Sequence, residues 1–243
     1  MYYLLVTNLI EKRRKKRKMD KLTIKLNKSD VANIKKEDAE LNFWSKLFDT
    51  KGFHNKWYKY FYTEAFGITE GEYIGKRLLD IGCGPCGSLE WIADRAKCFG
   101  LDPLCNEYWK KFMCHQHKMN YIYSKAESIP FPDEYFDYVF SFNSLDHVEN
   151  VEKSCLEIAR VLTPGGKFLL YVDINHEPTV CEPHSLSIDV IKTVPLNCES
   201  FNLYGRKYHD NGYKDVREKT PPDIVPKILT AIFSKTLTIE NTK

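Results

Sequence analysis

The segment from Asp80 to Gly87, DIGCGPCG, has residue types and a spacing that could serve three different chemistries. Its CGPC has the dithiol spacing of thioredoxin-like redox sites. Its GxGxxG is the pattern of glycine turns that bind dinucleotides. Its acid, two residues before the first glycine, suits an adenosyl cofactor that carries positive charge instead of phosphate. Each interpretation predicts a different class of protein.

The redox interpretation fits the segment least well. A redox dithiol needs an exposed first cysteine whose pKa is lowered at a helix N-terminus. Here Cys83 and Cys86 stand among Gly82, Gly84 and Gly87, which a redox site does not require. Glycines in a turn allow a positive φ or a close approach of the backbone to a ligand. They therefore favour a ligand-binding turn.

The dinucleotide and S-adenosylmethionine interpretations share an acid on the next expected strand, and they differ at Asp80. Asp102 follows Gly82 by 20 residues, where an acid can accept hydrogen bonds from ribose hydroxyls. NAD and S-adenosylmethionine both contain that ribose. A pyrophosphate binds a bare helix N-terminus, and Asp80 would repel it, whereas the ammonium and sulfonium of S-adenosylmethionine attract an acid. The sequence favours S-adenosylmethionine, and an NAD(P)-dependent oxidoreductase is the alternative.

Apolar runs alternate with helical patterns from residue 77 onward, which predicts an α/β protein with a doubly wound, parallel sheet. The expected strands are 77–81, 97–101, 121–124, 136–142, 167–172, 201–204 and 229–235. The expected helices are 88–96, with Ser88 as its N-cap, 104–119, 151–162 and 185–191. Residues 38–66 have helical apolar spacing and many aromatic side chains, which predicts helices packed ahead of this domain.

From Lys76 to Lys235, about two thirds of its length, the chain resembles a class I S-adenosylmethionine-dependent methyltransferase of the type 11 small-molecule group. The matching segments are LLDIGCGP, GLDP, AESIPFPDEYFDYVFSFNSLDHV, RVLTPGGKFLL and ILTAIFSK. Their order and spacing make a chance match implausible. The resemblance implies a Rossmann-like, doubly wound, mostly parallel seven-stranded sheet with an antiparallel last strand, plus N-terminal helices.

The same resemblance implies which residues hold the cofactor. They are Asp80, Gly82, Cys83, Gly84, Asp102, Pro103, Ala126, Glu127 and Asn143. The first four would line the methionine moiety, and Asp102 would hold the ribose diol with Pro103 beside the adenine. Ala126 and Glu127 would contact the adenine, and Asn143 would face the sulfonium. The chain departs from the family at Lys125, where an Asp that accepts from the adenine amino group is common.

Two segments, which follow the expected strands four and five, could act on the molecule that accepts the methyl group. His147 and Asp146 are the candidates for a general base, because His is the usual base at neutral pH; the alternative is that both cap the next helix. The loop NHEPTVCEPH, residues 175–184, contains residues able to ligate a metal. Such polar loops are more often solvated or substrate-facing, so no metal is expected.

The charge distribution and missing motifs bear on the acceptor. Ten of the 36 Lys and Arg residues lie in residues 11–28, so the remaining chain is mildly acidic and a nucleic-acid partner is disfavoured. The [ND]PP[YF] motif of adenine methyltransferases is absent. Residues 145–150 and 175–187 are similar to segments of methyltransferases associated with bacterial surface glycans. A sugar or glycan hydroxyl is therefore expected, and a non-catalytic cofactor-binding subunit is an alternative from another class.

The expected domain organisation has three parts. Residues 1–28 form a basic, poorly ordered tail, 29–75 a helical cap, and 76–237 the methyltransferase domain with an acceptor-side insertion at 174–200. The apolar first ten residues fall short of the ~20 that span a bilayer, and their charges follow them, unlike a signal peptide. A cytoplasmic protein with reduced thiols is expected. Residues 11–18 could touch an anionic membrane surface, or translation could begin at Met19.

Overall fold

The computed structural model describes residues 28–55, 57–208, 212–222 and 224–237, with side chains from residue 35 onward. The chain divides into two units between Lys36 and Glu37. The predictions for residues 11–18 and Met19 lie outside the described residues. Within the described part of the chain, no helix is long and apolar enough to cross a membrane.

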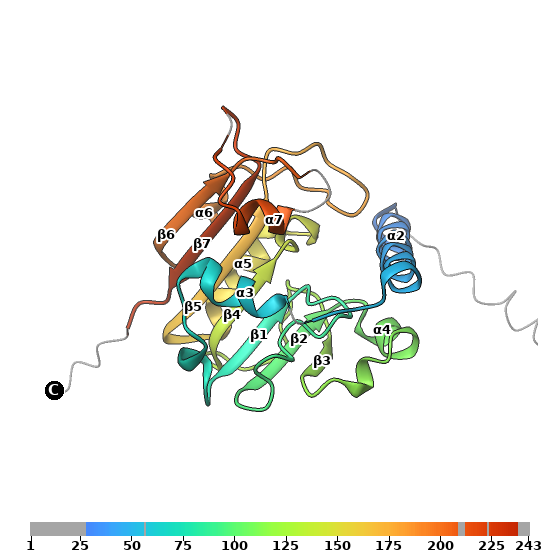
Figure 1. The fold of residues 1–243 in the computed structure, drawn as a ribbon, viewed down its shortest axis with the longest axis horizontal. Coiled ribbons are helices and arrows are strands. Elements are labelled where there is room, and N and C mark those ends of the chain that lie inside the picture. The colour runs from blue at the N-terminus through green and yellow to red at the C-terminus, as the bar shows by residue number, and fades with distance from the viewer. Residues whose placement is uncertain (1–27, 56, 209–211, 223, 238–243) are drawn as a thin grey trace, which may run out of the picture. The chain divides into compact units, whose positions relative to one another are not determined.

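A seven-stranded sheet forms the centre of the unit 37–243 (Figure 1). Its strands are β1 Arg77–Ile81, β2 Lys97–Asp102, β3 Asn120–Tyr123, β4 Phe136–Phe142, β5 Leu162–Asp173, β6 Asn197–Tyr204 and β7 Ile228–Ser234. They lie in the order β3-β2-β1-β4-β5-β7-β6, and only β7 runs antiparallel to its neighbours among these strands. The expected Rossmann-like sheet with an antiparallel last strand is confirmed.

The central strands are buried on both faces, which explains their near-continuous apolar sequences. Along β1, Leu79 and Ile81 belong to one core cluster, together with side chains of α5 Val151–Val161. Leu78 belongs to a second cluster, which contains the aromatic side chains of α3 Tyr58–Tyr62. The alternation of side chains along a strand thus places α5 on one face and α3 on the other.

The helix expected at 88–96 is not formed, and this prediction was wrong. Residues 88–95 form successive turns, in which the N–H groups of Glu90, Ile92 and Ala93 each bond the carbonyl three residues earlier. Ser88 does not cap a helix, because its hydroxyl donates to Asp80.

The other helices differ from expectation mainly in length. They are α2 Lys28–Lys51, α4 Cys105–Lys111, α6 Val190–Thr193 and α7 Gly212–Arg217, with 3-10 turns η1 Glu64–Phe66, η2 Glu70–Tyr73, η3 Cys114–Gln116 and η4 Leu145–His147. The helix expected at 104–119 ends at Lys111, because Met113 adopts the left-handed conformation with φ +57°. The helix expected at 185–191 is reduced to the single turn α6.

Arg160 ties the segment before β4 to α5. Its guanidinium donates to the carbonyls of Ile129 and Phe131, at 2.9 and 2.8 Å, and to the carboxylates of Glu157 and Asp133. Five donors in a planar fork suit this arrangement, which the point charge of a lysine cannot reproduce.

We predict that Arg160→Ala lowers the free energy of unfolding by about 1–3 kcal/mol, because hydrogen bonds from a charged group to two backbone carbonyls are lost. Chemical denaturation measures the change. Lys192→Ala is the control, since its ion pair with Asp189 is exposed and should change stability by less than about 0.5 kcal/mol. Equal effects of the two substitutions would contradict the structural role of Arg160.

Candidate active site

The candidate site lies at the carboxyl ends of β1, β2, β4 and β5. Chain order reverses between β1 and β4, because β1 pairs with β2 on one side and with β4 on the other. Ligands of open α/β sheets bind at such a reversal, outside the carboxyl ends of the strands. The predicted cofactor residues follow β1, β2, β3 and β4, so the topology brings their segments to one edge.

The turn after β1 needs glycine for its own packing. Gly82 and Gly84 have φ values of +68° and +57°, which L side chains rarely adopt. A Cβ on Gly82 would lie 2.3 Å from Cβ of Ser144, and one on Gly84 would lie 2.8 Å from the Trp44 ring. Neighbouring protein atoms therefore already restrict this turn, in addition to any ligand.

Asp80 is a buried acid at the end of β1. Its Oδ2 accepts hydrogen bonds from the Tyr62 hydroxyl at 2.8 Å and from the Ser88 hydroxyl. Burial raises the pKa of Asp80 to about 7, although the hydrogen bonds from Ser88 and Tyr62 lower it. A cation beside this carboxyl would favour its ionised form.

Asp102 joins the end of β2 to the glycine turn. Its Oδ2 accepts from the Gly84 N–H at 3.2 Å and its Oδ1 from the Leu104 N–H at 2.8 Å. Burial raises the pKa of Asp102 to about 6, against the lowering effect of these backbone bonds. Each carboxylate oxygen can accept a further hydrogen bond, so the arrangement remains compatible with a ribose diol.

The two thiols of the CGPC segment are buried instead of exposed. A Cβ on Gly100 would lie 2.6 Å from Cys83 Sγ, so the Cys83 side chain packs against β2. Burial raises the pKa of the Cys83 thiol and raises that of Cys86 to about 12. A redox dithiol needs the opposite shift, which agrees with the preference for a cofactor turn.

The two residues predicted to contact adenine have different surroundings. Ala126 is buried in the core cluster that contains α5. Glu127 Oε1 accepts from the N–H groups of Glu149 and Asn150, at 2.6 and 2.9 Å, so this carboxylate holds the chain entering α5. Lys125 pairs with Glu149. Adenine contact by Glu127 remains a prediction, and Pro103, which is half-buried after β2, is in the expected segment.

Asn143 has an unusual conformation just after β4. Its φ is +54°, and its N–H donates to the Tyr171 carbonyl at 2.8 Å. Its side-chain Oδ1 is buried and accepts no hydrogen bond from the described residues. Such an atom requires a donor, and the ammonium of an adenosyl amino acid is one. The hydrogen-bond acceptors of Asp80, Asp102 and Asn143 therefore fit the ammonium and ribose hydroxyls of S-adenosylmethionine.

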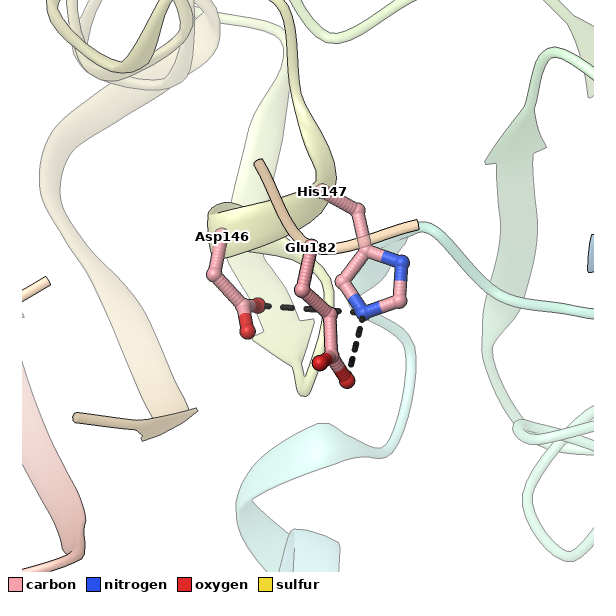
Figure 2. Close-up of side chains that lie close together, drawn as sticks. All are labelled: Asp146, His147 and Glu182. Carbon is pink, nitrogen blue, oxygen red and sulfur yellow. Dashed lines mark ion pairs between the residues drawn. The ribbon is translucent and has the colours of Figure 1, made fainter. Parts of the chain in front are cut away.

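Asp146, His147 and Glu182 converge beside the end of β4 (Figure 2). Asp146 is fully buried in the turn η4, and His147 Nε2 lies 3.9 Å from Asp146 Oδ1 and 3.7 Å from Glu182 Oε1. The other ring nitrogen, Nδ1, lies 3.7 Å from Glu40 Oε2. The N-cap of α5 is Asn150, so the alternative that Asp146 and His147 cap that helix is wrong.

His176 reaches the same acid from the loop after β5. Its Nε2 lies 3.3 Å from Asp146 Oδ2, and its Nδ1–H donates to the Glu177 carbonyl at 3.0 Å. The contact with Asp146 raises the pKa of His176 to about 9, although burial lowers it. Two histidines and two acids from distant segments thus meet at one place.

Hydrogen bonds fix the loop that carries Glu182. The His184 ring donates to the Val148 carbonyl at 2.9 Å, which docks the loop on the segment after β4. The Glu182 N–H donates to Thr179 Oγ1 at 3.0 Å, and the Thr179 hydroxyl donates to Glu182 Oε2 at 3.3 Å. Residues 174–200, predicted as an acceptor-side insertion, therefore contribute directly to this cluster, while residues 197–200 already belong to β6.

Sequence reasoning missed several residues of the site. Glu40 and Trp44 of α2 lie far ahead of the first strand in the chain. No motif marks them, because their roles come from packing against the turn. Ser88 was assigned to the wrong partner. The aromatic density of residues 38–66 was the one available signal.

Comparison with known proteins adds independent evidence. The family described as "Methyltransferase domain" matches residues 79–170. The chain is 38% identical over 99 residues to the sterol 4-C-methyltransferase strm-1 of Caenorhabditis elegans, covering 38% of this chain and 30% of that protein. It is 35% identical over 105 residues to a fatty-acid O-methyltransferase of Mycolicibacterium smegmatis, covering 41% and 37%. The chain thus spans about a third of the length of these relatives.

The chain carries a class I S-adenosylmethionine-dependent methyltransferase domain.

Solved structures agree with this assignment at the level of the fold. The [4+2]-cyclase SpnF has a TM-score of 0.54 and 19% identity, covering 70% of this chain and 79% of that chain. The YcgJ protein of Bacillus subtilis has a TM-score of 0.53 and 18% identity, covering 72% and 99%. Since one of these neighbours is a cyclase, the fold alone does not fix the reaction. The family and the fold imply S-adenosylmethionine as the cofactor of the methyltransferase domain.

We predict that Asp80 makes stability fall with rising pH. The unfolded chain releases this proton near the ordinary aspartate pKa of 3.8, whereas the folded protein keeps it up to about pH 7. Between these values the folded state binds more protons, so the free energy of unfolding decreases as pH rises, by up to about 1.4 kcal/mol per pH unit.

Asp80→Asn tests this, because the amide oxygen can still accept from Tyr62 and Ser88 but does not titrate. The unfolding free energy of the variant minus that of the parent, measured by denaturation, should increase as the pH is raised from 4 to 8. Parallel pH profiles of the two proteins would contradict a raised pKa at Asp80.

Proposed function

We propose that the chain transfers a methyl group from S-adenosylmethionine to a small-molecule acceptor by in-line displacement. One observation carries the proposal: buried acids end the neighbouring strands β1 and β2, and one of them is bonded to the glycine turn between them. Asp80 suits the cofactor ammonium and Asp102 suits the ribose diol. Asp80, in contrast, would repel the pyrophosphate of a dinucleotide.

The remaining predicted residues complete the proposed cofactor site. The backbone of Gly82, Cys83 and Gly84 follows the methionine moiety, and Asn143 Oδ1 accepts from its ammonium. Pro103, Ala126 and Glu127 are proposed to lie along the adenine. Since the methyl carbon is already activated by the sulfonium, alignment of donor and acceptor is the main task, and orientation alone supplies roughly 7–11 kcal/mol.

We propose that the cluster around His147 and Asp146 promotes loss of a proton from the acceptor. Assisted proton transfer contributes about 10²–10⁴-fold to a rate. His147 Nε2 lies between a carboxylate oxygen of Asp146, at 3.9 Å, and one of Glu182, at 3.7 Å. An acceptor hydroxyl placed beside this cluster would become a better nucleophile toward the methyl group.

The proposed acceptor is a hydroxylated small molecule, such as a sugar or a glycan. The relatives are named for sterol, fatty-acid and tocopherol substrates. Here, in contrast, the segments after β4 and β5 bring together carboxylates and imidazoles, which hydrogen-bond hydroxyl groups well. Nucleic acid is not proposed as acceptor. A cytoplasmic location is also proposed, on the irregular spacing of the cysteines in the sequence.

We predict that Asp102→Ala weakens binding of S-adenosylhomocysteine by about 10- to 100-fold, because hydrogen bonds to a charged group are lost. Isothermal titration measures the affinity, and a thermal melt checks that the variant is folded. Asp94→Ala is the control, since this exposed acid pairs only with Lys118 among the residues described. Unchanged affinity of Asp102→Ala, or binding of NADH without S-adenosylhomocysteine, would overturn the assigned cofactor site.

Turnover requires a separate experiment. The protein is incubated with methyl-labelled donor and a fractionated cell extract, and the labelled product is identified by mass spectrometry. We expect label in a small hydroxylated compound. Cofactor binding without transfer to any fraction would favour the non-catalytic subunit instead, and label in a lipid fraction would contradict the sugar proposal.

A further inference from the structure

We propose that Asp146, His147, His176 and Glu182 form a binding site for a divalent transition-metal ion. The proposal deepens the proposed function, on which its catalytic consequence rests, but metal binding itself can be tested without turnover.

The ligand atoms have suitable types and spacing. One ligand atom each from Asp146, His147 and Glu182 lies within 4.8 Å of the others. His176 Nε2 approaches the second oxygen of Asp146 at 3.3 Å. The three converging residues offer one imidazole nitrogen and two carboxylates, and His176 adds a second imidazole beside Asp146. Mixed nitrogen and oxygen ligands suit Mn²⁺, Fe²⁺ or Zn²⁺ better than Mg²⁺, which prefers oxygen.

The surroundings of Asp146 supply an independent reason for a cation. Its side chain is fully buried, and neither carboxylate oxygen accepts a hydrogen bond from the described residues. A buried carboxylate is costly unless a cation compensates it. Without a metal, the His176 ring at 3.3 Å from Oδ2 takes this role, and a bound ion would replace its proton. Figure 2 shows Asp146, His147 and Glu182 directed toward a common point, where an ion could reach all three.

Neighbouring residues already orient the other three side chains of the proposed site, His147, His176 and Glu182. His147 Nδ1 faces Glu40, whose Oε1 accepts from the Trp44 ring N–H at 3.0 Å. His176 Nδ1–H donates to a backbone carbonyl, which leaves Nε2 as the nitrogen facing the acid. Thr179 holds Glu182 Oε2, which leaves Oε1 toward His147. Metal-binding residues are oriented in this way by a second layer of hydrogen bonds.

A bound ion would explain how the cluster activates an acceptor. A hydroxyl coordinated to the ion is more acidic and loses its proton to water. The oxygen electron pair then forms the bond to the methyl carbon, and the electrons of the carbon–sulfur bond return to sulfur, which leaves neutral S-adenosylhomocysteine. His147 would serve as a metal ligand in this scheme, in place of the direct base predicted from the sequence.

The test uses the full-length chain after removal of metals with a chelator. Mn²⁺ is the probe, because it has little affinity for the eight thiols and its free form is quantified by electron paramagnetic resonance. We expect one Mn²⁺ per chain. Asp146→Asn and Glu182→Gln should each weaken binding by at least about tenfold. Glu177→Gln, which changes an exposed acid on the same loop, should bind within about twofold of the parent.

Absence of Mn²⁺ binding at millimolar concentration would overturn the proposal. Equal affinity of the parent and both ligand variants would also overturn it, since the ion would then bind elsewhere. Circular dichroism of each variant verifies folding, and Asp146→Asn and Glu182→Gln act at separate segments, so misfolding of one leaves the other decisive. The same samples are also titrated with S-adenosylhomocysteine. Failure to bind this ligand would count against the proposed function, whereas failure to bind Mn²⁺ would count only against the metal site.

Discussion

The burial of Asp80 beneath the glycine turn is the constraint on which the donor side of the structure depends. The hydroxyls of Tyr62 and Ser88 both donate to one oxygen of this acid, which joins α3 and the segment after the turn to the end of β1. Burial also raises the pKa of Asp80 to about 7. A buried acid with a pKa near neutrality is stabilised in its ionised form by a neighbouring cation, and the ammonium of S-adenosylmethionine is such a cation.

The chain order around β1 and β4 divides the site into two halves. The turn after β1 and Asp102 of β2 form the donor half, bonded together through Gly84. The segments after β4 and β5 form the acceptor half, in which Asp146 and Glu182 face the ring of His147. The Asn143 backbone bonds the Tyr171 carbonyl of β5, so β4 and β5 remain paired where the acceptor half begins.

The sheet was predictable because each strand is a short apolar run bounded by glycine, proline or an acid. The predicted bounds of β4 agree with those observed. The helix expected at 88–96 was not predictable from its apolar spacing, because Ser88 bonds Asp80 instead of capping. The cofactor segments were identified from motifs, whereas Glu40 and Trp44 were missed. Their contribution arises from packing between segments far apart in the chain, which local pattern does not encode.

The most direct test of the central claim is a crystal structure of the full chain with S-adenosylhomocysteine. We expect the ribose hydroxyls within hydrogen-bond distance of Asp102 and the amino group of the ligand on the side of Asp80 and Asn143. We also expect the sulfur to lie toward the half of the site that contains His147. Ligand bound elsewhere, or with its ribose away from Asp102, would contradict the assignment of the turn after β1 as the cofactor site.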